Sequence, residues 1–281
     1  MLFRSACERQ FYVSAGNHTL NANVKLTLTG AGAERNIQYN GAGTDLFLLN
    51  ANGASLTLGR NITLRGASAA GSRRVIGVFN GGSLTMLDGS KITGHTASSF
   101  FYTVTVGGAT SVFTMKGGEI SGNHHTGSES DATGGVYVQE HATFVMSGGK
   151  ISGNTSAFNA SSAADVMVSH LTQFTLSGNA EIGAIILHAY ALHASVNITG
   201  FYGGKVERFH LYGYDANPNT VAGYWTDKTV IVGGSAANIA MFNAALGQFR
   251  TSGTATQNIT GNIGGTANYR ISGAGVLEQV P

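Results

Sequence analysis

A short apolar–polar–apolar motif recurs six times along the chain at an almost constant interval. Its first apolar residue advances by 30, 28, 29, 31 and 30 residues from one copy to the next. A fixed period of this length indicates a repeat architecture, in which each unit buries its apolar face only by stacking on its neighbours. The two apolar positions of the copies are Leu26/Leu28, Leu56/Leu58, Leu84/Met86, Phe113/Met115, Phe144/Met146 and Phe174/Leu176.

Each repeat predicts three short strands. The alternation within the motif has period two, so its two apolar side chains point to the same side of a strand. A second strand is expected after a glycine-containing turn, at 61–63, 91–93, 119–121, 150–152 and 181–183. A third is expected before the motif, where pairs of apolar residues also alternate: Leu46/Leu48, Ile76/Val78, Val104/Val106, Val136/Val138 and Val166/Val168.

These three strands predict an all-β fold, a right-handed, three-faced parallel β-helix of about six to seven coils over residues 11–200. Helical and leucine-rich repeats would need helical periodicity, which the repeat region lacks. Residues 1–10 contain no apolar signal segment, and we expect them to be a non-native or unstructured start of a chain that belongs to a longer protein. After Gly183 the period breaks, and residues 201–281 are expected to form an irregular cap or terminal coils, because a solenoid end exposes apolar surface and unpaired edges.

The charge and cysteine content exclude several classes of protein. Only 11% of residues are charged, the net charge is +2, and Arg73-Arg74 is the longest basic run, so we expect no nucleic-acid partner. No segment approaches the ~20 apolar residues of a membrane helix, which predicts no membrane span in this chain. The single Cys7 excludes an internal disulfide.

Two polar columns are predicted by stacking the repeats in register. Lys91, Glu119, Lys150 and Glu181 alternate in sign, an arrangement that favours the correct register over a slip by one coil. The column after the following glycine contains His95, Asn123 and Asn154, which predicts a short amide ladder at a bend.

The charged column also permits a catalytic interpretation. Glu119 and Glu181 would lie two coils apart, roughly 9.6 Å, near the upper end of the range for an inverting glycosidase pair. Lys150 stands between them, and a neighbouring cation favours ionised carboxyl groups, whereas a general acid needs a raised pKa. We therefore assign no catalytic residue.

Histidines and aromatic residues are the remaining candidates for ligand contact. His124 and His125 open an insert with Glu129 and Asp131, but adjacent histidines point apart in extended chain and no third fixed ligand accompanies them. His141 and His170 lie in nearly equivalent turns. We expect solvated loop histidines, no metal and no cofactor. Aromatic side chains between 201 and 225 either cap the solenoid or stack on sugar rings. The candidate ligand-binding residues are His124, His125, Tyr212, Tyr214, Tyr224 and Trp225.

The sequence GGVYV at 134–138, followed by ATFVMSGGKISGN at 142–154 and echoed by FTMKGGEISGN at 113–123, resembles a known type of repeat. It is similar to the repeats of bacterial surface and secreted proteins of the right-handed parallel β-helix (pectate-lyase-like) superfold. Pectate lyases of that superfold use clustered aspartates for calcium with a catalytic arginine, and polygalacturonases use several close aspartates with a Gly-His-Gly turn. Here 94–96 lacks the second glycine, and the aspartates are isolated: Asp45, Asp88, Asp131, Asp165, Asp215 and Asp227.

The resemblance implies an extracellular or bacterial cell-surface location. With the lyase residues missing, we expect a non-enzymatic β-helix module, a structural spacer and adhesin that binds a glycan or host surface. A carbohydrate-active enzyme, either a polysaccharide lyase or a glycoside hydrolase, is the first alternative. A phage tailspike-like fibre, which would require trimerisation, is the second.

Overall fold

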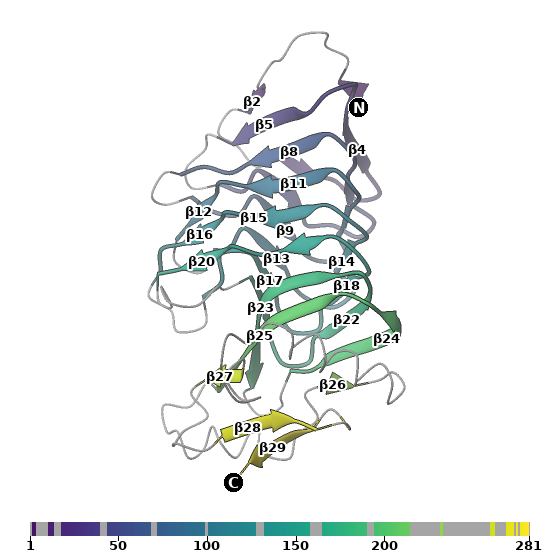
Figure 1. Ribbon diagram of the computed structural model, residues 1–281. Helices are drawn as coiled ribbons and strands as arrows, with labels where there is room; N and C mark the ends of the chain where they lie inside the picture. The colour runs from purple at the N-terminus through teal and green to yellow at the C-terminus, as the bar shows by residue number, and fades with distance from the viewer. Residues whose placement is uncertain are drawn as a thin grey trace.

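The computed structural model describes residues 2–3, 11–13, 18–39, 44–68, 72–98, 101–127, 132–157, 165–189, 194–213, 231–232, 259–261, 268–272, 274 and 276–280. Short strands stack in parallel along one axis to form a β-solenoid (Figure 1). No helix occurs in these residues. The predicted all-β parallel solenoid is therefore confirmed.

Three long rows of strands run along the solenoid, and we name them sheets 1, 2 and 3. Sheet 1 contains β1 (Leu2–Phe3), β4 (Lys25–Gly30), β7 (Ser55–Leu58), β10 (Ser83–Met86), β14 (Val112–Met115), β18 (Thr143–Met146), β22 (Gln173–Gly178), β24 (Val196–Tyr202) and β26 (Ile231–Val232). Sheet 2 contains β2 (Phe11–Val13), β5 (Arg35–Tyr39), β8 (Ile62–Arg65), β11 (Ser90–Thr93), β15 (Glu119–Ser121), β19 (Lys150–Ile151), β23 (Glu181–Ala189), β25 (Lys205–Gly213) and β27 (Ile259–Gly261). Sheet 3 contains β3 (His18–Leu20), β6 (Phe47–Leu49), β9 (Ile76–Val78), β13 (Val104–Val106), β17 (Val136–Val138) and β21 (Val166–Val168).

Two smaller sheets complete the described strands. Three two-residue strands lie at the bend between sheets 2 and 3: β12 (Thr96–Ala97), β16 (His124–His125) and β20 (Thr155–Ser156). The sequence did not predict them, because two residues are too few to show alternation. β28 (Asn268–Ile271) and β29 (Leu277–Val280) form an antiparallel pair near the C-terminus.

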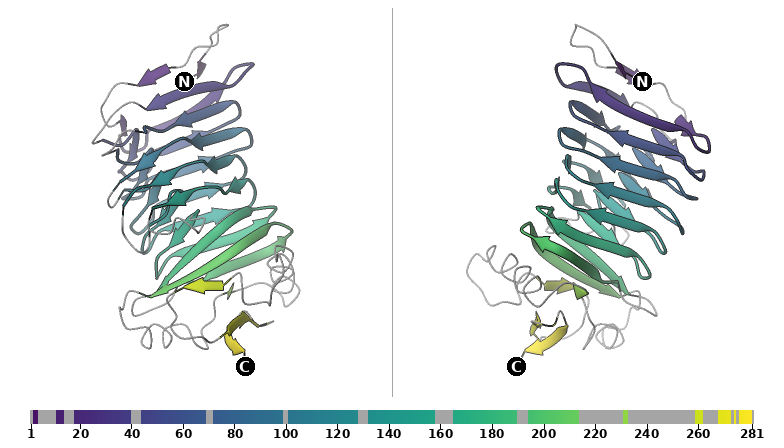
Figure 2. Two further views of the ribbon diagram at one scale, coloured as in Figure 1. Left: turned by 60° about the vertical axis from the view of Figure 1, so that its left-hand side comes forward. Right: turned by 90° about the vertical axis from the view of Figure 1, so that its right-hand side faces the viewer.

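Each coil passes from sheet 3 to sheet 1 to sheet 2, and the coils follow one another down the axis (Figure 2). The regular part has about five turns, from β6 to β23, against the six to seven predicted. The coils that flank it are less regular. Upstream, β4 and β5 are longer than β7 and β8, the strands that follow them in their sheets; downstream, the pairing of β22 with β24 shifts between Leu176 and Gly178.

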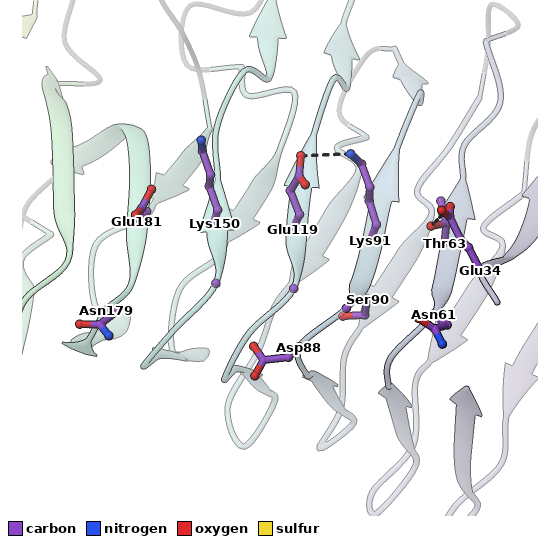
Figure 3. Close-up of a pocket in the computed structure, with 13 residues that line it drawn as sticks. Glu34, Asn61, Thr63, Asp88, Ser90, Lys91, Glu119, Lys150, Asn179 and Glu181 are labelled. Carbon is purple, nitrogen blue, oxygen red and sulfur yellow. Dashed lines mark hydrogen bonds and ion pairs between the residues drawn. The ribbon is translucent and has the colours of Figure 1, made fainter. Parts of the chain in front are cut away.

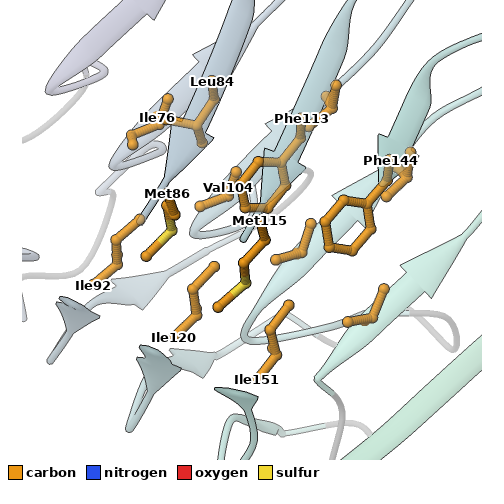
Figure 4. Close-up of a cluster of buried hydrophobic side chains, with 14 of the residues drawn as sticks. Ile76, Leu84, Met86, Ile92, Val104, Phe113, Met115, Ile120, Phe144 and Ile151 are labelled. Atoms are coloured by element: carbon orange, nitrogen blue, oxygen red, sulfur yellow. The ribbon is translucent and has the colours of Figure 1, made fainter. Parts of the chain in front are cut away.

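The core lies between the three sheets and consists of the predicted apolar columns. The motif residues pair in register from coil to coil, Leu56 with Leu84 and Leu84 with Phe113. Phe113, Phe144 and Phe174 stack face to face, with ring centroids 4.6 and 5.0 Å apart and planes within 6° of parallel. Methionines and isoleucines of sheets 1 and 2 fill the space beside the rings (Figure 4).

The predicted register is wrong at two places in the first coils. In sheet 3, Phe47 and Leu49 pair with Ile76 and Val78, so Leu48 faces outward although it was placed in the core. In sheet 2, Leu64 and not Ile62 pairs with Ile92. Both errors have one cause. In these segments, apolar residues also stand one or two positions away from the residues that pair, so the alternation of apolar and polar residues fits more than one register.

The strand β23 changes the shape of the last regular coil. Its first residues pair with β19, and residues 185–187 pair with β21. Sheets 2 and 3 therefore become continuous along this strand. A shortened coil follows, because Phe174 pairs with Val196, 22 residues later. Residues 184–189 of β23 then pair with β25.

The turn that leads into sheet 1 contains a left-handed residue in each of the six coils from β4 to β22. Asparagine and glycine occupy this position in the first three coils, and threonine, histidine and leucine in the next three. The residues, with their φ angles, are Asn23 (62°), Gly53 (72°), Gly81 (81°), Thr110 (67°), His141 (62°) and Leu171 (59°). Glycine adopts this conformation without steric cost, whereas branched or bulky residues are strained in it.

Candidate ligand-binding groove

A shallow groove of about 520 Å³ crosses the strands of sheet 2 on the outside of the solenoid (Figure 3). Because the strands lie perpendicular to the solenoid axis, a groove that crosses them runs along the axis. Its lining residues come from successive coils: Glu34, Asn61, Thr63, Asp88, Gly89, Ser90, Lys91, Gly118, Glu119, Gly149, Lys150, Asn179 and Glu181. Polar and charged side chains therefore dominate it.

The predicted charge column forms one wall of the groove. Lys91 pairs in register with Glu119, Glu119 with Lys150, and Lys150 with Glu181. Lys91 Nζ lies 3.1 Å from Glu119 Oε1, and both side chains are about two-fifths exposed. Lys205, which the sequence analysis did not include, pairs with Glu181 and extends the alternation, with Nζ 3.8 Å from Glu181 Oε2.

Glycines form the floor of the groove because no side chain fits there. Gly118 and Gly149 have φ angles of 85° and 84°. A Cβ atom at Gly118 would lie 2.4 Å from Ser90 Oγ, and one at Gly149 would lie 2.7 Å from the backbone of Gly117. A Cβ atom at Gly117 would overlap with the carboxylate of Asp88. The corner between sheets 1 and 2 is thus left open beside the charged wall.

Glu119 is held in its ionised form. Ser121 donates a hydrogen bond to Glu119 Oε1, and Lys91 Nζ donates another. These contacts, with the charge of Lys150, lower the pKa of Glu119 below its ordinary value against the opposing effect of partial burial. The direction agrees with the effect expected from the neighbouring lysines, and an ionised carboxylate is suited to accept hydrogen bonds rather than to act as a general acid.

The second predicted column is a buried amide ladder. The backbone N–H of His95 donates to Asn123 Oδ1 at 3.0 Å, and the side-chain amide of Asn123 donates to Asn154 Oδ1 at 2.8 Å. Each asparagine also donates to a main-chain carbonyl, Asn123 to Ile92 and Asn154 to Ile120. The ladder holds the glycine bends between sheet 2 and the short strands β12, β16 and β20.

Asp165 ends this ladder, and the sequence analysis did not predict this role. Asn154 donates to Asp165 Oδ1 through its backbone and its side chain, and the backbone N–H of Ala184 donates to Oδ2 at 2.9 Å. Asp165 is fully buried, and burial raises its pKa to about 6. The carboxylate lies at the bend and not in the groove.

His95 is also buried, and it was predicted to sit in the amide column. Its Nε2 atom lies 2.5 Å from the carbonyl oxygen of Arg73, whereas Nδ1 has no partner in the described part of the chain. Burial lowers the pKa of His95 to about 4. The ring is therefore neutral at physiological pH and donates from Nε2.

The two histidines that open the insert lie in different environments, one partly exposed and one buried. His124 is partly exposed, and its Nδ1 lies 2.8 Å from Thr155 Oγ1. His125 is completely buried and stacks on Tyr102, with ring centroids 5.2 Å apart. The expectation that both are solvated loop residues is wrong for His125, because β16 turns its side chain inward at the bend.

The other two histidines, His141 and His170, lie in equivalent turns of adjacent coils but are offset by one position. His141 and Leu171 are the left-handed turn residues of adjacent coils, so His170 lies opposite Glu140 rather than His141. His170 Nε2 lies 3.3 Å from Glu140 Oε1. Within the described residues, no group of three or more His, Cys, Asp or Glu side chains is placed to hold a metal ion.

The remaining candidate residues lie at or beyond the end of the described solenoid. The backbone of Tyr212 belongs to β25 and pairs with His188. Tyr214, Tyr224 and Trp225 lie outside the described residues, as do Glu129 and Asp131 of the insert. Ligand binding by these side chains stays a prediction.

In the part of the chain that the structure describes, no helix has the length and apolar character needed to cross a membrane. Comparison with protein-family models, with curated proteins and with solved structures finds no match to this chain.

Proposed function

We propose that this chain is a non-enzymatic β-solenoid module of a secreted or surface-displayed bacterial protein, which acts as a rigid spacer and binds a glycan along the groove of sheet 2. The observation that carries the proposal is the groove itself: an open, polar channel that crosses five neighbouring strands, β8, β11, β15, β19 and β23. A small molecule would use a more enclosed site. An extended polymer can contact several coils at once.

The chemistry of the walls suits sugar hydroxyl groups. Lysine ammonium groups donate hydrogen bonds and ionised carboxylates accept them, so a wall that alternates Lys91, Glu119, Lys150 and Glu181 offers donors and acceptors in turn. The exposed ion pair of Lys91 and Glu119 contributes well under about 1 kcal/mol to stability. These residues are therefore available for contact with a ligand without a large cost to the fold.

The principal alternative is a carbohydrate-active enzyme that uses Glu119 with Glu181. The ionised state of Glu119 is compatible with a base or nucleophile, which is the observation in its favour. A hydrolase of this type also needs a carboxyl group with a raised pKa. Asp165 has one, but it is buried at the bend and does not line the groove. A tailspike-like fibre would be an obligate trimer, which light scattering tests directly.

A polysaccharide panel tests the proposal, with binding and release of reducing or unsaturated ends scored on the same samples. We expect binding without turnover, and Lys150→Gln to weaken it about tenfold through loss of a charged donor. Lys25→Gln, which removes an exposed lysine of β4 outside the groove, is the matched control. The double variant Lys91→Glu/Glu119→Lys keeps the net charge and an ion pair between these two positions. It exchanges the positions of the positive and the negative side chain on the groove wall.

Each outcome has a defined meaning. Binding that weakens in Lys150→Gln and in the inverted double variant, but not in Lys25→Gln, supports the groove. Turnover that disappears in Glu119→Gln would replace the proposal with the enzyme. Binding that is equal in all variants would move the ligand site away from sheet 2.

A further inference from the structure

Two adjacent arginines just before β9 of sheet 3 lie against the same phenylalanine ring. The guanidinium carbon of Arg73 lies 4.7 Å from the centroid of the Phe101 ring, and that of Arg74 lies 5.1 Å from it. Arg74 also lies 5.0 Å from the ring centroid of Phe79. Contacts of a guanidinium with aromatic faces stabilise the charge and restrict the orientation of the planar group. We name Arg73, Arg74, Phe79 and Phe101 the arginine–phenylalanine cluster.

A buried carboxylate fixes one edge of the cluster. Arg74 Nε donates to Asp45 at 3.1 and 3.2 Å, and the backbone N–H of Arg74 donates to the same carboxylate. The Asp45 side chain is only 2% exposed, whereas that of Arg74 is 16% exposed. Gly77 leaves room for this arrangement, because a Cβ atom there would lie 3.0 Å from the Phe79 ring and 3.2 Å from Asp45 Oδ2.

The donors that remain point to a ligand with negative charge. Within the described part of the chain, the Nη groups of Arg74 and the whole guanidinium of Arg73 make no hydrogen bond. The main chain beneath them is held in place, since the Arg73 carbonyl contacts buried His95. Two oriented guanidinium groups with free donors are pre-organised to bind carboxylate or sulfate oxygens.

We propose that the arginine–phenylalanine cluster binds the anionic groups, carboxylate or sulfate, of an acidic glycan. Nucleic acid is disfavoured because two arginines at one position do not form the basic stripe that a phosphate backbone needs. The cluster lies at sheet 3 and the groove lies on sheet 2, so this inference goes beyond the proposed function and does not require the groove to bind anything.

The test measures binding of oligogalacturonate, which carries carboxylates, and of a heparin-derived oligosaccharide, which carries sulfates, by calorimetry at physiological salt. A neutral maltooligosaccharide and a single-stranded oligodeoxynucleotide are the comparison ligands. The variants are Arg73→Gln, Arg73→Lys and Phe101→Leu. Arg65→Gln is the control, because it removes an exposed arginine of β8. Arg74 is left intact, since its removal would strand the buried Asp45 carboxylate.

We expect at least one acidic oligosaccharide to bind more tightly than the neutral one. Arg73→Gln should weaken that binding about tenfold, and Arg73→Lys should also weaken it, because an ammonium keeps the charge but not the planar donor pair. Arg65→Gln should leave it unchanged. The proposal is overturned if neither acidic oligosaccharide binds, if Arg65→Gln weakens binding as much as Arg73→Gln, or if the oligodeoxynucleotide binds as tightly as the acidic glycans. Binding is also measured for the groove variant Lys150→Gln. A loss of binding in Lys150→Gln concerns the groove of the proposed function, whereas a loss in Arg73→Gln concerns the arginine–phenylalanine cluster.

Discussion

The carboxylate of Asp165 accepts two hydrogen bonds from Asn154, one from its backbone and one from its side chain, at 2.9 and 2.8 Å. It thus makes the contacts that Asn154 itself makes with Asn123 one coil earlier. A residue just before β21 replaces the amide that the following coil would have supplied. The replacement introduces a titratable group into a completely buried position.

Asp165 and His95 are expected to give opposite pH dependences. The pKa of Asp165 is raised from 3.8 to about 6, so its contribution to stability is present below pH 3.8 and is lost as pH rises through 6. The pKa of His95 is lowered from 6.5 to about 4, so its contribution is present above pH 6.5 and is lost as pH falls through 4. Each effect is on the order of 3 kcal/mol.

Single variants should separate the two groups. Asp165→Asn should make the free energy of unfolding rise more steeply between pH 4 and 6 than in the wild type, and His95→Asn should make it fall. Urea denaturation at several pH values measures both slopes. Curves that stay parallel to the wild type in both variants would show that neither group titrates differently in the folded and unfolded states.

Asn123→Ala should destabilise the protein by about 2–4 kcal/mol, because it removes the acceptor of the buried His95 N–H and the side-chain donor to the Ile92 carbonyl. Asn50→Ala is the matched control. It removes an exposed amide that accepts a similar bond from Asn80 at 2.9 Å, and it should cost under about 0.5 kcal/mol. Equal losses in the two variants would contradict a special role for the buried ladder.

Leu171→Gly should stabilise the protein by about 0.5–1 kcal/mol. Leu171 has a φ angle of 59° and its side chain is 44% exposed, so glycine relieves the strain while little burial is lost. Leu171→Ala keeps a Cβ atom in the same conformation and should give no gain. Chemical denaturation distinguishes the variants, and a gain in alanine equal to that in glycine would rule out backbone strain as the cause.

Phe144→Leu should cost about 2 kcal/mol, because it removes a ring stacked on both sides by Phe113 and Phe174 and leaves unfilled volume. Phe47→Leu changes a buried phenylalanine of sheet 3 outside this stack and should cost less. Thermal unfolding of both variants gives the comparison. A larger loss for Phe47→Leu would mean that ring stacking is not what distinguishes these core positions.

The sequence allowed the solenoid to be predicted because identical spacing places equivalent residues in columns. Phe113, Phe144 and Phe174 repeat one pattern, and their burial and stacking follow from it. The same logic fails at Leu48 and Ile62, where neighbouring apolar residues fit more than one register. It also gives no information on β23, which continues through the position of the bend, where the backbone N–H of Ala184 donates to Asp165.

The same distinction applies to the candidate sites: the site built from repeated residues could be predicted from the sequence, and the site built from unrepeated residues could not. The charged wall of the groove was predicted because Lys91 and Glu119 stand in a repeated column. The arginine–phenylalanine cluster occurs once, and its partners Arg73 and Phe101 stand 28 residues apart without any repeated motif. A feature that occurs in one coil has no periodic signal, so only its three-dimensional contacts reveal it.

The straight course of β23 also limits how such an array can lengthen. Repeat proteins grow by duplication of whole units, and a new unit fits only between neighbours that offer equivalent edges and bends. Coils that bend at Gly122 or Gly153 meet this condition. Beyond Asp165 the bend is gone and sheets 2 and 3 are one surface, so an added coil with the bend would not match β23. We therefore expect duplication of bent coils to lengthen the solenoid only among the coils that precede this point.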